Sequence, residues 1–91
     1  MAMRIFSAQG SKYAALIILG DHEEFDAMEV VEWTNEAPGK MILEFRMDDT
    51  SARLSYIHSE VDISLLRVAL EIFREEFFEP RWKSGTPCPP W

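Results

Sequence analysis

The strongest constraint on the fold lies near the C-terminal end, where apolar residues recur in steps of three and four between residues 61 and 79. Charged residues take the opposite side of this repeat, and Pro80 ends it because proline cannot continue an α-helix. The apolar stripe consists of Ile63, Leu66, Leu70, Phe73 and Phe77. We therefore predict an amphipathic helix that packs on another layer, with Ser59 as its N-cap residue.

A period of two precedes this helix and indicates strands. Residues 41–47 alternate between apolar and more polar side chains, residues 48–51 (Asp-Asp-Thr-Ser) suit a turn, and residues 52–56 alternate again. The apolar row of the first strand is Met41, Leu43, Phe45 and Met47. These features predict a hairpin with one buried face.

The N-terminal segment shows a similar hairpin pattern. Residues 4–7 and 12–19 flank the turn-forming sequence Gln-Gly-Ser at positions 9–11. Residues 13–19 are apolar on both faces of their strand, whereas one layer of helices covers only one face of a sheet. We therefore expect a cover for the second face, supplied by the C-terminal tail, a second copy of the chain or another protein.

Two interpretations of residues 22–35 lead to different folds. In the preferred one, these residues form a helix capped by Asp21, which stands 38 positions before Ser59. The element order would then be ββαββα, an α+β fold with a four-stranded antiparallel sheet carrying two helices on one face. The repeated order would be consistent with an internal duplication.

In the alternative, residues 27–34 form a strand because they are rich in β-branched and aromatic side chains. Pro38 and Gly39 would then turn the chain into the strand that begins at Met41. Glu32 and Glu36 favour this alternative, because carboxylates near a helix C-terminus oppose the helix dipole. The resulting fold is a five-stranded antiparallel meander with one C-terminal helix.

Length and composition predict one folded domain followed by a short tail. The chain has 91 residues, of which 47% are hydrophobic, so it can bury one core. We expect residues 1–80 to form this domain and residues 81–91 to form a proline-rich tail containing Trp82 and Trp91. No membrane-spanning stretch occurs, and the single cysteine permits no intrachain disulfide, so a cytoplasmic location is expected.

The distribution of charge suggests the function. The net charge is −7, and residues 21–36 hold seven of the sixteen acidic residues with no Lys or Arg. Such a segregated acidic surface would attract a partner protein with a basic surface, such as a nucleic-acid-binding protein. The residues expected to make the contact are Glu24, Asp26, Glu29, Glu32 and Trp33. The predicted function is that of a non-enzymatic protein-binding domain.

Several roles fit this function. An inhibitor that mimics nucleic acid, of the type encoded by phages or mobile elements, or an immunity-type protein would have this size and charge. A simpler explanation is a solvated surface that keeps a small protein soluble. A different function is a homodimeric structural or assembly subunit that uses an apolar sheet face and the tail. Its contacts would involve Ile17, Ile18, Trp82 and Trp91.

No pattern predicts a catalytic, metal or cofactor site. His22 and Asp26 would share a helix face, but a metal site needs three or four converging ligands. Cys88 lies between two prolines, where no neighbouring base would activate its thiol. Direct nucleic-acid binding is disfavoured because acidic residues interleave with the bases of the last helix.

Overall fold

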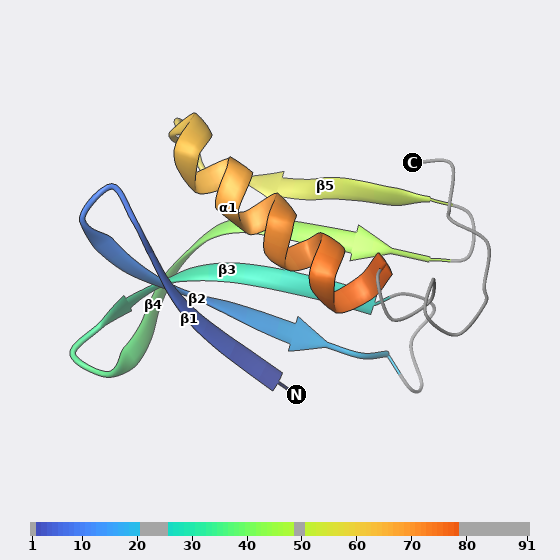
Figure 1. The fold of residues 1–91 in the computed structure, drawn as a ribbon, viewed down its shortest axis with the longest axis horizontal. Coiled ribbons are helices and arrows are strands. Elements are labelled where there is room, and N and C mark those ends of the chain that lie inside the picture. The colour runs from blue at the N-terminus through green and yellow to red at the C-terminus, as the bar shows by residue number, and fades with distance from the viewer. Residues whose placement is uncertain (1, 21–25, 49–50, 79–91) are drawn as a thin grey trace.

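The described part of the chain is a five-stranded antiparallel meander with one helix. The computed structural model describes residues 2–20, 26–48 and 51–78. The strands follow one another across the sheet in chain order, and the helix crosses one face of it (Figure 1). The elements are β1 (Ala2–Ala8), β2 (Ser11–Ile18), β3 (Asp26–Thr34), β4 (Ala37–Met47), β5 (Ala52–Ile57), α1 (Ile63–Phe73) and a π-helical turn, η1 (Arg74–Phe78). The fold is therefore α+β and matches the alternative interpretation.

The prediction of a helix over residues 22–35 is wrong for residues 26–34, which form β3. β3 is the central strand and is apolar on both faces: Met28 and Val30 are buried on one face, Ala27 and Val31 on the other. The apolar positions 27, 28, 30 and 31 are also three and four residues apart, as on one face of a helix, which explains the wrong prediction. Residues 21–25, with the predicted cap, lie outside the described residues, and the four-stranded, two-helix arrangement is ruled out by β3.

Two hairpins close through two-residue turns with positive φ. The first turns at Gln9 and Gly10, with φ of 53° and 76°, as the sequence predicts. The second turns at Asn35 and Glu36, with φ of 52° and 60°, instead of at residues 38 and 39. A two-residue turn with positive φ at both residues matches the right-handed twist of the flanking strands. The chain therefore turns before Pro38, which lies in β4.

A β-bulge shifts the pairing of β3 with β4. Val30 pairs with Leu43 but Val31 pairs with Met41, so Ile42 is an extra residue on β4. Met41 is therefore only partly buried and faces away from the core, whereas Ile42 joins the core. The predicted inward row of the strand is wrong at Met41 and right for the rest of the row.

The core lies between α1 and one face of the sheet, here called the helix face. The helix buries Leu65, Ala69 and Ile72 against the strands. The predicted stripe is right at Phe73 and Phe77 and wrong at Ile63 and Leu70, which are exposed. The ring of Phe73 stacks on Phe45 of β4 with centroids 5.1 Å apart. Burying large apolar side chains in this way stabilises the fold by about 1.5–3 kcal/mol for each one.

The C-terminal end of the helical segment is tied to the first strand. The Arg4 guanidinium donates hydrogen bonds to Glu75 at 2.7 Å and to Glu76 at 3.4 Å, both in η1. The hydrogen bond to Glu75 raises the pKa of Arg4 above its ordinary value. These side chains are largely exposed, so the pairs fix the position of the helix end more than they stabilise the fold.

The N-cap of α1 is Asp62 and not Ser59. The Asp62 carboxylate accepts hydrogen bonds from the backbone N–H of Ser64 at 2.8 Å and from its hydroxyl at 2.5 Å. Gln9 in the first turn donates to the Ser64 hydroxyl at 2.6 Å, which joins that turn to the start of the helix. The hydrogen bonds from Ser64 lower the pKa of Asp62. Ser59 has a φ of 20° and lies before the helix begins.

We predict that Asp62→Ala lowers Tm at neutral pH, because the first turn of α1 loses its cap, while Ser59→Ala changes Tm little. The ordinary pKa of 3.8 is lowered in the folded state. The stabilisation is therefore complete above 3.8 and is lost as pH falls through the lower folded-state value. Thermal unfolding followed by circular dichroism should show the Asp62→Ala difference shrinking in acid, and equal effects of both variants would contradict Asp62 as the cap.

Candidate functional site

The sheet face opposite α1, here called the open face, carries a second set of apolar side chains. Ala14, Ala27 and Val31 are buried on it and do not belong to the core beneath the helix. No described element packs on this face (Figure 1). Strand alternation and register place seven larger apolar or aromatic residues there: Met3, Ile5, Leu16, Ile18, Trp33, Met41 and Tyr56. A single layer therefore leaves much apolar surface on the open face, as the sequence of β2 predicts.

One row of side chains crosses the middle of the open face. The pairing of neighbouring strands aligns one residue from each strand, in the order Met3, Leu16, Glu29, Glu44 and Tyr56. The ends of the row are apolar and aromatic, and two carboxylates lie directly opposite each other at its centre. Like charges in directly opposed positions destabilise a sheet.

The two carboxylates differ in their partners. Glu44 accepts hydrogen bonds from Arg46 Nε at 2.9 Å and from the Ser55 hydroxyl at 2.6 Å, and its side chain is 12% exposed. Glu29 is partly buried and has no hydrogen bond or ion pair with any residue that the structure describes. The centre of the open face therefore holds two neighbouring carboxylates, of which Glu29 has no partner in the part of the chain that the structure describes.

The predicted partner-binding residues do not form one surface. Glu29 and Trp33 lie on the open face, whereas Asp26 and Glu32 project from β3 on the helix face. Glu24 lies outside the described residues. The expected acidic helix face is thus replaced by a strand whose acids point to both sides.

The two acids on the helix face have different surroundings. Asp26 accepts a hydrogen bond from the backbone N–H of Gly20 at 3.0 Å, so it holds the chain between β2 and β3. Glu32 lies opposite Tyr13 and lines a small polar hollow of about 230 Å³ beyond the helix. Neither belongs to the surface that contains Glu29.

The residues predicted for a dimer contact also separate. Ile17 is buried on the helix face beneath α1, so it is not available for a contact. Ile18 is partly buried on the open face, where a partner could reach it. Trp82 and Trp91 lie outside the described residues.

The most important residue that sequence reasoning missed is Glu44. Alternation along β4 places it away from the core, but its position opposite Glu29 depends on the register of β3 and β4. Strand pairing across a two-residue turn could have suggested that register once residues 27–34 were taken as a strand.

The described residues contain neither a cluster of metal ligands nor a helix that could span a membrane. Residues 2–20, 26–48 and 51–78 contain no cluster of three His, Cys, Asp or Glu side chains arranged to hold a metal ion. The helical segment in the described part of the chain is too short and too polar to cross a bilayer.

Comparison with known proteins gives no relative: no family model matches the chain, and no curated protein or solved structure is significantly similar to it. The function must therefore be inferred from the chemistry of its surfaces.

We predict that Glu29→Gln stabilises the isolated domain by about 0.5 kcal/mol, because it removes a charge that faces Glu44 across the strands. Glu32→Gln is the matched control, since it removes the same charge from the same strand but on the other face. Urea unfolding of the three proteins gives the comparison. An equal gain in both variants would assign the effect to net charge instead of to the pair.

Proposed function

We propose that this protein is a non-enzymatic binding domain that engages a basic, partly apolar surface of a partner protein through its open face. The observation that supports this most is Glu29, a carboxylate that has no partner among the described residues and lies at the centre of a row with apolar and aromatic ends. A Lys or Arg side chain of the partner, placed between Glu29 and Glu44, would replace the repulsion of the two carboxylates with charge-assisted hydrogen bonds.

The residues around this acidic centre suit a protein interface. Met3 and Ile5 are exposed at one end of the face, and Tyr56 is exposed at the other. Apolar and aromatic side chains around a buried polar contact exclude water and strengthen it. Trp33 lies on the same face and is partly buried, so it would add a rigid aromatic contact.

The charge of the whole chain supports the choice of partner. A net charge of −7 would steer a basic protein toward the domain and accelerate encounter at low salt. Proteins that bind nucleic acid carry basic surfaces because they neutralise phosphates. An inhibitor or immunity-type role, in which the open face occupies such a surface, is the form of the proposal that best fits the size and charge of the chain.

The proposal predicts that Glu29→Lys weakens partner capture on the order of 30-fold, because a cation would replace the carboxylate at the centre of the interface. Glu32→Lys makes the same change in net charge on the same strand, but on the helix face, and should capture the partner almost as well as wild type. The measurement is affinity capture from host extract, quantified by mass spectrometry and repeated at rising salt concentrations.

Two results would contradict this proposal. Equal loss of capture in both variants would mean that net charge, and not the open face, attracts the partner. Capture that does not weaken with salt would remove the ionic contact on which the proposal depends.

A second candidate function is a homodimeric subunit joined through the open face. Arg46 and Arg53 pair across β4 and β5 in the row next to Glu44. A twofold axis through the face could therefore place arginines of one copy against carboxylates of the other, while the apolar residues pack together.

If the protein is such a homodimer, light scattering should give about twice the monomer mass. Ile18→Asp should convert it to a monomer, because the dimer would bury the new charge on the open face without a partner. Leu70→Asp places the same charge at a surface position on α1, away from the open face, and should leave a dimer of this kind intact. A monomer at high concentration would exclude this candidate and leave the heteromeric function in place.

A further inference from the structure

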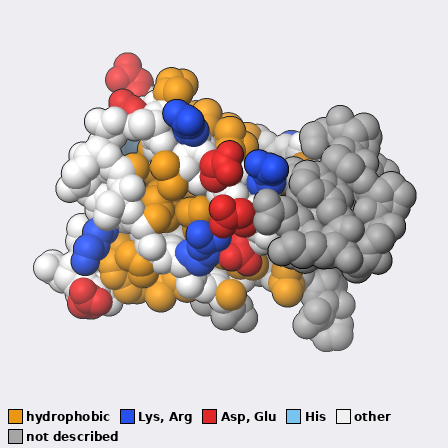
Figure 2. Space-filling view, viewed as in Figure 1, with side chains coloured by type: hydrophobic (Ala, Val, Ile, Leu, Met, Phe, Trp, Pro, Cys, Tyr) orange, Lys and Arg blue, Asp and Glu red, His pale blue; other side chains and the backbone are white. Residues whose placement is uncertain are grey.

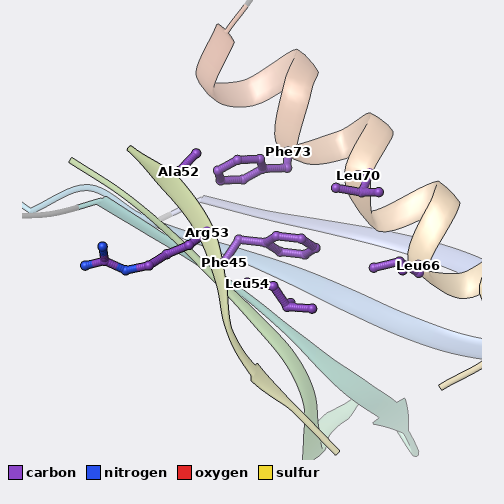
Figure 3. A pocket seen from close by; sticks show the side chains of 7 residues that line it. All are labelled: Phe45, Ala52, Arg53, Leu54, Leu66, Leu70 and Phe73. Carbon is purple, nitrogen blue, oxygen red and sulfur yellow. The ribbon is translucent and has the colours of Figure 1, made fainter. Parts of the chain in front are cut away.

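A second apolar surface lies on the other side of the molecule, between α1 and the edge strand β5. The helix does not reach over β5, so a groove of about 290 Å³ separates the two elements. Figure 3 shows Leu66, Leu70 and Phe73 from the helix, and Phe45, Ala52 and Leu54 from the strands, around this groove. Its lining is almost entirely apolar.

The helix contributes an exposed apolar flank to the groove. Ile63, Leu66 and Leu70 are spaced by three and four residues, so they share the flank next to the residues that pack on the sheet. Ile63 is 75% exposed and Leu70 is 48% exposed, which is unusual for large apolar residues beside a groove. Figure 2 shows hydrophobic side chains reaching the surface beside the charged side chains of this face.

The strand contributes a free backbone edge. Among the described strands, β5 pairs with β4 alone, so the N–H and C=O groups on its other side have no strand partner. It contains no proline and no lysine, and Arg53 is its one charged residue. Natural sheets normally protect an exposed edge with such residues, and an unprotected edge beside a groove accepts an added strand.

Two arginines lie near the groove, although the whole chain is acidic. Arg67 follows Ile63 by four residues, so it lies along the outer rim of the same flank, and no described carboxylate is within ion-pair distance of it. Arg53 points away from the groove on the other side of β5 (Figure 3), with Asp48 at a distance of 3.9 Å. A strand added to β5 would therefore meet an arginine on each side.

These features select one class of occupant. A second copy pairing β5 with β5 would bring the same arginines toward each other. Residues 80–91 of the chain contain Arg81 and Lys83 and no acidic side chain, so they would also add positive charge. A segment of another protein with carboxylates at alternate positions would place them on the side of the sheet where Arg53 lies and would complement its charge.

We propose that the groove between α1 and β5 binds an extended acidic peptide segment of a partner protein as a sixth strand of the sheet. Backbone hydrogen bonds to β5 hold the peptide. Apolar side chains at every second position insert between Leu54 and Leu70, and the carboxylates between them, which face the other side of the sheet, pair with Arg53. This inference does not depend on Glu29, whose proposed partner would carry the opposite charge.

The test uses a library of nine-residue peptides selected on the immobilised full chain. Odd positions carry Glu, Lys or Ser, and even positions carry Val, Ile, Leu or Phe. We expect enrichment of Glu over Lys. The affinity of the best peptide, measured by fluorescence anisotropy, should fall on the order of tenfold or more in Leu70→Asp, which places a charge in the apolar wall.

Two further variants make the test specific. Ile5→Asp places the same charge at a similarly exposed apolar residue on the open face, and it should leave binding unchanged. Arg53→Glu should shift the selected peptides from Glu toward Lys, because it reverses the charge on the side of β5 that the odd positions face. When the best peptide is added, the backbone amide resonances of residues 52–57 should shift in nuclear magnetic resonance spectra.

Each alternative result overturns the proposal. No enrichment, or equal enrichment of Lys and Glu, would show that the groove does not select acidic segments. Amide shifts confined to the open face would place binding elsewhere. Enrichment only after deletion of residues 80–91 would make the tail the occupant, and a dimer in light scattering that Leu70→Asp dissociates would make it a second copy.

Discussion

A single helix of eleven residues cannot cover both faces of a five-stranded sheet, nor the full width of one face. The stacking of Phe73 on Phe45 fixes the helix over β4, and the pairing of Arg4 with η1 draws its end toward β1. This placement leaves two surfaces that no described helix or strand covers, the open face and the helix side of β5. Both proposed binding surfaces follow from that one packing arrangement.

The sequence predicts the first hairpin from its turn residues, and the second hairpin and the helix because each shows one apolar side. Alternation in β4 and the three-and-four spacing after residue 60 each correspond to one geometry only. β3 differs because both of its faces are buried, so Met28 and Val31 satisfy a helical pattern as well as a strand. Local sequence could not decide between them, since the strands on either side of β3 create its environment.

The candidate site was predictable to a smaller extent. Glu29 and Trp33 were identified from charge and residue type, and they do share a face, but on a strand, where Val31 lies between them. Their separation from Glu32 follows from the period of two, which the helical interpretation replaced with a different set of neighbours. Glu44 joins Glu29 through strand register alone, and the groove beside β5 depends on where the helix crosses the sheet. Neither is encoded in a local pattern.

The sheet has two free edges, because β1 and β5 each pair with one described strand. If β5 of one molecule paired with β1 of another, the contact would be heterologous and could repeat without closing, as in a growing filament. A peptide bound along β5 would occupy the growing end. A ligand bound to this edge would thus block the addition of further molecules and prevent filament growth.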